Sequence, residues 1–432
     1  MLGSDVLSRV TARTPRPTDV STRVVGLLAL AIFINYVDRG NLSTAAPLLK
    51  DELHLSYSQI GTLLAAFFWS YAPAQLLGGW LALRYDVRYV LAGGLALWAG
   101  ATLCTGLAGG FATLLILRLL LGLGECVFYP CQAQMLAQGA TEDRRGGANG
   151  LVVAGQVLGL AIGALCGGLL MAAAGWRSTF FVFGAGSLLW LWPWLQATRR
   201  APEAEVPAPR PSPVTYLEIL RRRAVWGTSA ASFLAFFGFY FVLTWMPTYL
   251  VKHRGFSVAE MAWIGALPYC ADAAGAYFFG WLSDRWIRAG ACIDRVRRRV
   301  LAIGLAGASL AFVLGAVAAG NFAAVLALVL AGLFIGMATP QIFSLAQIYG
   351  GARAAGKWMA VQNMFGNIAG ATAPMVVGLV VERTGSYFWA FALAALMALL
   401  GALLCGFLLP TVRAVEWPDE AARVAHAAPQ AE

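Results

Sequence analysis

The sequence is poor in charged residues and in the residue types that build metal or redox sites. Charged side chains make up 12% of its 432 residues, against about 25% in a typical soluble domain, while 59% are hydrophobic and the mean hydropathy is +0.70. The three histidines stand far apart, at His54, His253 and His426, and no two of the seven cysteines form a Cys-x-x-Cys pair. The scarcity of charge excludes water as the main solvent. The pattern favours neither a disulfide framework nor a metal site, so no metal and no cofactor is expected.

Long apolar segments fill the chain instead. A helix needs about 20 apolar residues to cross a bilayer, and segments of that length follow one another from end to end. Their approximate bounds are 24–48, 58–82, 88–108, 111–137, 147–174, 177–197, 225–250, 258–283, 299–319, 322–348, 357–381 and 386–409. The sequence therefore predicts an all-α membrane protein with twelve transmembrane helices and no separate soluble domain.

The basic residues indicate topology and not nucleic-acid binding. The net charge is +10, but the arginines and lysines lie in short loops between the apolar segments and form no basic fold of their own. With both termini on one side, 24 of the 31 basic residues fall on that side and five on the other. The positive-inside rule then predicts that both termini are cytoplasmic.

A polar, Pro-rich segment divides the chain into two halves. We expect a cytoplasmic tail over residues 1–23, a six-helix bundle over 24–198, a linker over 199–224, a second bundle over 225–410 and a tail over 411–432. A repeat supports this division, because Gly79-Trp80-Leu81-Ala82-Leu83-Arg84 recurs 201 residues later as Gly280-Trp281-Leu282-Ser283-Asp284-Arg285. The two halves are expected to be pseudo-symmetric.

Twelve spans, a central linker and the repeated GWLxDR-like loop together resemble the major facilitator superfamily. Within it, NYVDRGNLS (35–43), RLLLGLGE (118–125) and GQVLGLAIG (155–163) resemble the anion:cation symporter family, which includes bacterial galactonate-type sugar-acid transporters, sialin and the vesicular glutamate carriers. The resemblance implies transport of organic carboxylates, commonly with protons. It also implies the inner membrane of a bacterium and a protein that works as a monomer, with a small carboxylate and the bilayer as its partners.

One departure from that family concerns the gating loops. The first copy of the loop carries Leu83 where the family has an aspartate, so its ion pair is expected to be weakened, or rebuilt through Asp86 near Arg84. The second copy keeps Asp284 and Arg285.

Charged residues at bilayer depth are costly and are therefore functional candidates. The predicted spans contain five of them, Asp38, Arg39, Arg118, Glu125 and Asp272. The alternative for each is a structural ion pair or a position nearer a span end.

Asp38 and Arg39 are adjacent on a helix and point about 100° apart, so we expect different roles for them. Arg39 shares a face with Tyr36, and its planar guanidinium matches a carboxylate in two-point contact. We assign Arg39 and Tyr36 to the substrate, as the resemblance also implies. Asp38 is the expected proton site, because desolvation favours the neutral form of a carboxyl group.

Arg118 and Glu125 are seven residues apart and so lie on one face, with Gly122 between them leaving room for a neighbouring helix. We expect a switchable ion pair. The resemblance assigns a coupling proton to Glu125. Three carboxylates and two guanidinium groups at depth sum to −1, so protonation of two carboxylates would attract an anion and couple the two ligands.

Uncharged polar residues extend the predicted site. The resemblance places substrate contacts at Tyr71, Gln156 and Asn363. Bonding between helices is the alternative for Gln156 and Asn363 and the favoured interpretation for two further glutamines, Gln75 and Gln341. Core packing is favoured for four aromatic residues, Trp69, Phe237, Tyr240 and Trp245.

Asp272 has no counterpart in the galactonate-type pattern. It shares a helix face with Gly265 and Gly280, which favours a crowded interior position, and we expect it to tune substrate selectivity. A shallow position at a span end is the alternative.

Glycines recur every fourth residue in span five, at Gly155, Gly159, Gly163 and Gly167, and predict close contact with another helix.

The sequence thus predicts a proton-coupled symporter of a small organic anion, a sugar acid or another carboxylate, working by alternating access. An exporter or antiporter of an amphipathic compound and a membrane sensor without transport remain alternatives; the short loops and tails speak against the sensor. An enzyme is not expected, since no HExxH motif and no Ser/His pair lies at depth.

Overall fold

The computed structural model describes residues 22–139, 142–199 and 214–417. The helices of the first half are α1 (Thr22–Glu52), α2 (Tyr57–Arg84), α3 (Val87–Thr105), α4 (Phe111–Glu125), α5 (Phe128–Gly139), α6 (Glu142–Leu189) and α7 (Leu191–Thr198). Those of the second half are α8 (Tyr216–Leu220), α9 (Arg223–Thr248), η1 (Tyr249–His253), α10 (Val258–Arg288), α11 (Ile293–Val317), α12 (Asn321–Thr384), α13 (Tyr387–Leu403) and η2 (Leu404–Leu408). The described part of the chain is nearly all helical, as predicted.

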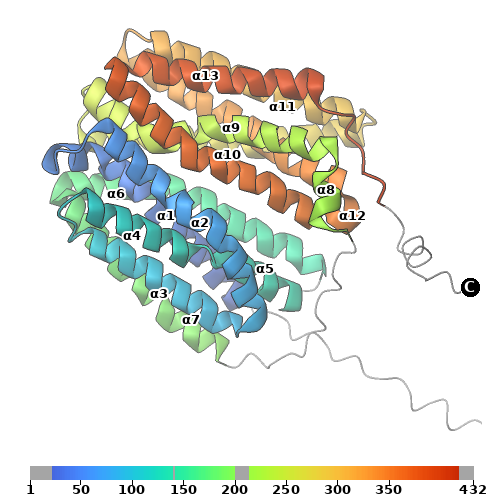
Figure 1. Ribbon diagram of the computed structural model, residues 1–432, viewed down its shortest axis with the longest axis horizontal. Coiled ribbons are helices and arrows are strands. Elements are labelled where there is room, and N and C mark those ends of the chain that lie inside the picture. Colours follow the sequence, from blue (N-terminus) through green and yellow to red (C-terminus); the bar gives the residue numbers. More distant parts are fainter. Residues whose placement is uncertain (1–21, 140–141, 200–213, 418–432) are drawn as a thin grey trace, which may run out of the picture.

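Two bundles lie side by side with their helices running in roughly the same direction (Figure 1). The helices α1 to α7 form one group, and α8 to α13 form the other. We call the end where α7 stops and α8 begins the linker end, and the opposite end the far end. The division of the chain into two helical halves is therefore visible in space.

These helices contain twelve helical segments that are long enough to cross a membrane. Ten helical segments of the described chain are long and apolar enough to cross a membrane. Two of these ten are the parts of α12 before and after its break at Gly351. The long α6 is broken at Gly175, where φ is +80°, a conformation that favours glycine. It therefore contributes two helical segments. The helix α10 is outside the ten because it is less apolar, but its 31 residues are long enough to cross a membrane. The prediction of twelve spans is confirmed.

The glycine stripe of α6 packs against α1. A Cβ added at Gly155, Gly159, Gly163 or Gly167 would collide in turn with Ala29, Phe33, Val37 and Asn41 of α1. These positions are also four residues apart, so the two helices touch along one face for several turns. The contact confirms the predicted packing role. It leaves the neighbouring face of α1, with Asn35, Tyr36 and Arg39, turned toward α2 and α4.

The pseudo-symmetry extends to the helix starts. Ser56 and Gln59 form a capping box at the beginning of α2, and Ser257 and Glu260 form one at the beginning of α10. In each box the serine hydroxyl accepts from the backbone N–H three residues on, and that residue's side chain accepts from the serine N–H. The two boxes are again 201 residues apart, the offset of the repeated loop.

The two halves meet most closely toward the far end. Lys252 forms an ion pair with Asp51 across the seam between them. The backbone N–H of Ser58 at the start of α2 donates to Glu382 of α12 at 2.6 Å. A Cβ at Gly168 of α6 would lie 2.5 Å from the Cβ of Ala262 in α10. These contacts close the seam at the far end.

The predicted linker, 199–224, lies partly outside the described residues. Its described part forms α8, whose Ile219 is buried in the core of the second half together with Val214. After η2 the chain also stays against this half, since Val412 is buried and the Trp417 indole donates to the Gly350 carbonyl at 3.0 Å. The predicted N-terminal tail and most of the C-terminal tail lie outside the described residues.

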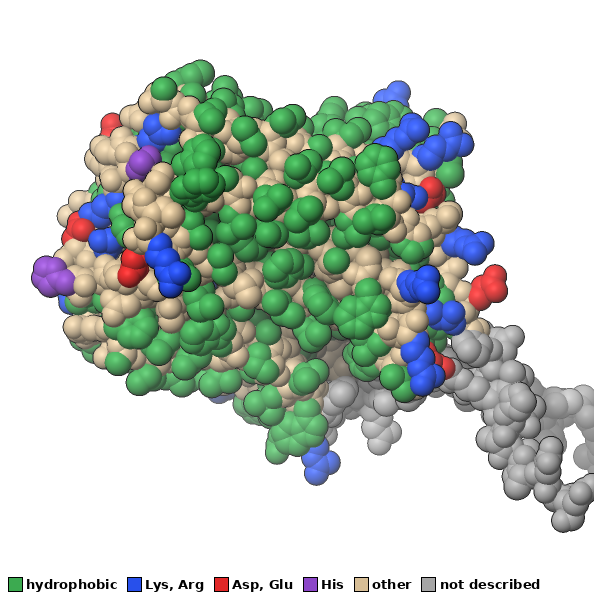
Figure 2. All heavy atoms as spheres, turned by 45° about the horizontal axis from the view of Figure 1, so that its top comes forward, with side chains coloured by type: hydrophobic (Ala, Val, Ile, Leu, Met, Phe, Trp, Pro, Cys, Tyr) green, Lys and Arg blue, Asp and Glu red, His purple; other side chains and the backbone are tan. Residues whose placement is uncertain are grey.

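The surface matches a membrane protein. In Figure 2 the middle of the visible face is covered by hydrophobic side chains, and charged side chains gather at its two ends. Arginines and lysines are concentrated at the linker end. A bilayer would cover this apolar middle zone and leave both charged ends in water.

Candidate functional site

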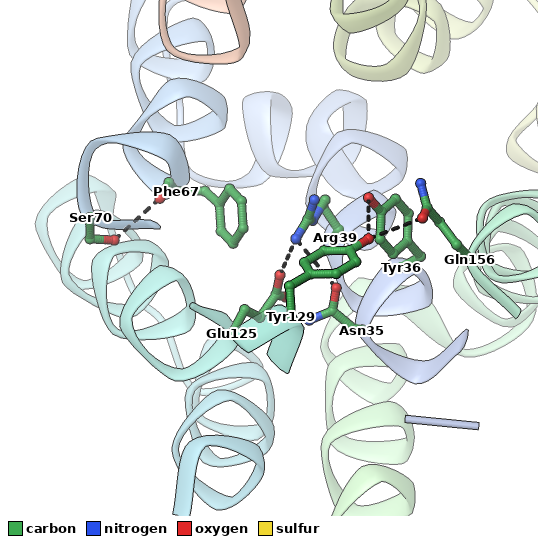
Figure 3. A network of polar contacts seen from close by, with 8 residues as sticks. All are labelled: Asn35, Tyr36, Arg39, Phe67, Ser70, Glu125, Tyr129 and Gln156. Carbon is green, nitrogen blue, oxygen red and sulfur yellow. Dashed lines mark hydrogen bonds and ion pairs between the residues drawn. The ribbon is translucent and has the colours of Figure 1, made fainter. Parts of the chain in front are cut away.

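A buried ion pair lies in the middle of the first half. The Arg39 Nη2 of α1 donates to the Glu125 Oε2 of α4 at 2.7 Å and to the Asn35 Oδ1 at 3.3 Å (Figure 3). Arg39 is 8% exposed and Glu125 is 1% exposed. Because an isolated charge is unfavourable in such a place, each group stabilises the ionised form of the other.

Aromatic rings surround the guanidinium of Arg39. Its Cζ lies 4.5 Å from the ring centre of Tyr36, 4.7 Å from that of Phe67 and 5.0 Å from that of Tyr71. Phe67 and Tyr71 of α2 are stacked on each other, with ring centres 4.9 Å apart. The predicted shared face of Arg39 and Tyr36 is confirmed. The rings fix the orientation of the guanidinium by cation–π contact.

Close packing of α2 against α4 brings these rings to the ion pair. Gly122 lies between Arg118 and Glu125, and a Cβ there would be 2.5 Å from the Phe67 carbonyl oxygen. The Ser70 hydroxyl donates across the same contact to the Leu119 carbonyl at 2.8 Å. The room that Gly122 provides is therefore used by α2, as predicted for a neighbouring helix.

A chain of hydrogen bonds beside the ion pair reaches α6. The hydroxyl groups of Tyr36 and Tyr129 are 3.4 Å apart, and the Tyr129 hydroxyl donates to the Gln156 Oε1 at 3.0 Å (Figure 3). The chain joins α1, α5 and α6. Of the predicted substrate contacts, Tyr36, Tyr71 and Gln156 thus lie around Arg39.

Asp38 faces away from Arg39, as the helix geometry predicts. Its Oδ2 accepts from the Ser187 hydroxyl of α6 at 3.4 Å, and the side chain is 2% exposed. The two adjacent charges of α1 therefore have different neighbours.

Arg118 does not bond Glu125 in this structure. Its guanidinium lies 5.5 Å from the ring centre of Phe67, and Glu125 is bonded by Arg39 instead. The predicted switchable pair of Arg118 and Glu125 is thus not formed in this conformation, because Arg39 bonds the Glu125 Oε2 and Arg118 lies over the Phe67 ring.

Several buried polar atoms around the ion pair have no partner among the described residues. They are Asn35 Nδ2, Asp38 Oδ1, Arg39 Nε, Asn41 Nδ2 and Oδ1, Arg118 Nε and Glu125 Oε1. Buried polar atoms are normally satisfied, so this cluster marks a place where water or a polar ligand would supply the missing bonds.

Two predicted residues lie apart from this cluster. Asn363 of α12 is exposed and has no hydrogen bond within the described part of the chain. Seven residues further on, Gly370 faces Phe68 of the first half, so Asn363 lies on the same helix face nearer the linker end. Asp272 is half-buried near the middle of α10, which excludes the alternative of a span end, and among the described residues it has no hydrogen bond or ion pair.

The second gating loop is tied to its own half. Asp284 forms an ion pair with Arg297 of α11 at 2.7 Å, and Arg297 also donates to the Gln341 Oε1 at 2.9 Å. Gln341 in turn donates to the Ser283 hydroxyl at 3.1 Å, which confirms its predicted role in bonding between helices. Arg285 instead lies over the Trp281 ring.

The first gating loop is different. Asp86 caps the start of α3 and pairs with Arg88 at 2.9 Å, while Arg84 is exposed. This ion pair is local to one helix start, so Asp86 does not take over the bonding that Asp284 provides in the second half.

Packing was the favoured interpretation for four aromatic residues. Phe237, Tyr240 and Trp245 are buried, and the Trp245 indole donates to the Pro374 carbonyl at 3.0 Å. Packing is thus confirmed for these three. Trp69 is 43% exposed, so the packing interpretation is wrong for this residue.

Sequence reasoning missed Tyr129, Asn35 and Phe67. Tyr129 follows a break between α4 and α5 at Cys126 and Val127, so its direction could not be deduced from helical spacing with Glu125. Asn35, by contrast, is four residues before Arg39, the spacing of side chains on one helix face, and that signal was present.

The chain belongs to the Major Facilitator Superfamily, whose family model matches residues 28–293 and 287–431. It is a multi-pass membrane protein of a family of transporters. This agrees with the resemblance noted from the motifs.

Its relatives include several carriers of organic acids. The probable sulfoacetate transporter SauU of Cupriavidus necator is 33% identical over 422 residues, covering 94% of this chain and 98% of the relative. The hexuronate transporter of Bacillus subtilis is 29% identical, covering 88% and 92%. The probable L-galactonate transporter of Escherichia coli is 25% identical, covering 92% and 91%.

A solved structure shares the fold. The bacterial homologue of the human lysosomal transporter Spinster, in an inward-facing and occupied conformation, matches with a TM-score of 0.78 and 20% identity, covering 89% of this chain and 96% of that one.

Proposed function

We propose that the protein is a proton-coupled symporter of a small organic anion, a sugar acid or another carboxylate, in the bacterial inner membrane. The observation that supports this most is the buried Arg39, enclosed by aromatic rings and bonded on one nitrogen to Glu125. The relatives named for sulfoacetate, hexuronate and galactonate all act on compounds that carry an acidic group.

Arg39 is the substrate anchor in this proposal. Its Nη2 is engaged by Glu125 and Asn35, whereas its buried Nε has no acceptor among the described residues. Once Glu125 releases Nη2, a substrate carboxylate could accept hydrogen bonds from Nε and Nη2, which lie on one edge of the planar guanidinium. Gln156, Tyr36 and Tyr129 stand beside it with groups able to bond the hydroxyls of a sugar acid.

Glu125 links the proton to the substrate. While it is ionised, it neutralises Arg39 and competes with an incoming anion for the same nitrogen. Protonation of Glu125 removes its charge and leaves Arg39 free to attract the substrate. Proton uptake and anion binding therefore favour each other, and by linkage the coupling acts in both directions. Asp38, bonded to Ser187 on the other side of α1, is a second proton site.

Movement follows the seam between the halves. The far-end contacts, among them Lys252 with Asp51, would open when the site faces the periplasm, and contacts at the linker end would form in their place. Small residues on both sides of the seam, such as Gly168 and Ala262, permit helices to slide past each other. We place both termini and the linker end in the cytoplasm, in accord with the concentration of basic residues there.

The test is uptake by purified protein in liposomes, using labelled sulfoacetate, galactonate and glucuronate as probes. A pH gradient, acidic outside, should drive accumulation of the acid that the protein accepts. Glu125→Gln, which imitates the protonated carboxyl group, should abolish pH-driven accumulation and preserve exchange of labelled for unlabelled acid. Glu52→Gln, the same change on a half-exposed far-end carboxylate, is the matched control and should behave as wild type.

The other candidate functions give different outcomes. Full pH-driven accumulation by Glu125→Gln would remove the coupling role of Glu125. Accumulation driven only by a gradient of reversed direction would identify an exporter or antiporter. Binding of an acid without transport by the wild-type protein would identify a sensor.

A further inference from the structure

One face of α10 is apolar and exposed along its whole length. Trp263 near its start is 60% exposed, Tyr277 is 80% exposed and Trp281 is 44% exposed. The opposite face packs on α12, where Gly332 meets Pro268 and Gly336 meets the backbone of Asp272. Since the exposed face is rich in large apolar residues in a membrane-spanning helix, it is in contact with lipid.

A groove of about 680 Å³ lies at the linker end of this face. It is lined by Ala276, Tyr277, Trp281, Asp284, Ile287 and Arg288. Arg285 adjoins it, because its guanidinium lies over the Trp281 ring at 5.4 Å. Aromatic side chains thus form the part nearer the middle of the helix, and charged side chains form the part nearer its end.

The charge of the groove is positive. Its one lining carboxylate, Asp284, forms an ion pair with Arg297 at 2.7 Å and is neutralised from the side of α11. Neither Arg285 nor Arg288 has an ion pair within the part of the chain that the structure describes. Two guanidinium groups therefore stand at the edge of an apolar groove without a counter-charge among these residues.

We infer that this groove binds one anionic phospholipid. Arg285 and Arg288 bond the phosphate of the headgroup, since guanidinium matches phosphate in planar, charge-assisted hydrogen bonds. Tyr277 and Trp281 lie along the glycerol and the first acyl carbons, the depth at which these residue types are enriched. The inference rests on the proposed orientation, which places the linker end in the cytoplasmic leaflet, where anionic lipid attracts basic residues.

Binding is measured by native mass spectrometry of the purified, delipidated full chain, titrated with phosphatidylglycerol or phosphatidylcholine. We expect a tight 1:1 adduct with phosphatidylglycerol and much weaker binding of phosphatidylcholine. Arg285→Gln/Arg288→Gln should weaken the phosphatidylglycerol adduct roughly 30-fold, since each basic residue near an anionic surface contributes about a factor of five. Tyr277→Ala/Trp281→Ala should also weaken it, without any change of charge.

The matched control is Arg221→Gln/Arg223→Gln, which removes two exposed arginines at the linker end outside the groove. It should retain the wild-type adduct. Equal losses in the control and the groove variant would show a diffuse attraction to basic surface and overturn the site, as would unchanged binding in Arg285→Gln/Arg288→Gln. Competition by excess inorganic phosphate as effective as that by the lipid would show a phosphate site only. None of these readouts requires transport, so the result is independent of the proposed symport.

Discussion

The two halves of the molecule share a fold and differ in what they bury. Among the described residues, every charged side chain classed as buried lies in the first half: Asp38, Arg39, Arg118 and Glu125. The buried polar residues of the second half are all uncharged, for example Thr228, Gln341 and Gln362. The repeated loop and capping boxes show that the halves have one architecture, so the difference lies in chemistry and not in topology.

The packing of the helices also differs between the two halves. In the first half, three glycines of α6 meet the backbone of α1, and the fourth, Gly167, meets the Asn41 side chain. In the second half, aromatic rings pack between η1 and α13, where the Tyr249 ring lies 5.3 Å from that of Tyr387 and 4.9 Å from that of Phe391. Asp284, Arg297 and Gln341 also bond three helices of this half together at the linker end. In the proposed function, the first half would therefore hold the ligands and the second half would supply the opposing wall.

The largest expected effect is on Arg39. Arg39→Lys keeps the charge but loses the planar fork, so binding of the accepted acid should weaken roughly 10- to 100-fold, the equivalent of a charge-assisted hydrogen bond of about 1.5–3 kcal/mol. Isothermal titration of the purified protein measures this. Arg298→Lys is the control in the second half, where the arginine bonds the carbonyl groups of Cys405 and Gly406 and pairs with Asp294 at 3.8 Å. Unchanged affinity in Arg39→Lys would show that Arg39 does not bind the acid and would contradict a substrate site around it.

Glycine substitutions test the difference in packing. In Gly159→Ala the new Cβ would lie 2.5 Å from the Phe33 carbonyl oxygen, which cannot move without α1, and overpacking should lower stability by about 1–3 kcal/mol. In Gly366→Ala the Cβ would meet ring atoms of Phe236, 2.8 Å away, which can rotate. Its melting temperature should therefore fall less. Equal decreases in the melting temperature of the two variants would mean that both halves tolerate an added methyl group equally well.

Asp272 is the test of whether the second half takes part in substrate choice. We expect Asp272→Asn to change the relative uptake of mono- and dianionic acids several-fold and to alter its pH dependence, because a carboxylate on the path of the acid would repel an anion unless it is protonated. Uptake of sulfoacetate, galactonate and glucuronate between pH 5.5 and pH 8 gives both quantities. Wild-type preference together with wild-type pH dependence would leave Asp272 a structural role only.

The smallest effects concern the gating loops. Both Asp284–Arg297 and Asp86–Arg88 are partly exposed pairs, each worth about 0.2–1 kcal/mol. Arg297→Gln should nevertheless raise hydrogen exchange at the linker ends of α10, α11 and α12 together, because it also releases Gln341. Arg88→Gln should raise exchange only at the start of α3. Exchange that spreads equally from both variants would contradict the asymmetry of the loops.

Much of the fold followed from patterns of short range. Apolar length gave twelve spans, and spacing of four along α6 gave its contact face, because both depend only on helix geometry and the hydrocarbon thickness. The shared face of Arg39 and Tyr36 followed from the same geometry. Helix geometry did not predict where helices are interrupted, at Gly175 and between α4 and α5. The interruption between α4 and α5 sets the direction of Tyr129.

The sequence by itself determined which charges lie within the membrane spans, since any charged residue in an apolar span of this length is carried into the membrane. Only the tertiary structure decided how they pair. Glu125 is seven residues from Arg118 but bonds Arg39, which is 86 positions away, because α2 wedges into the space at Gly122 and holds Phe67 against Arg118. Pairing across helices depends on the distances between helix axes, and those are set by the packing of small residues between helices that are remote along the chain.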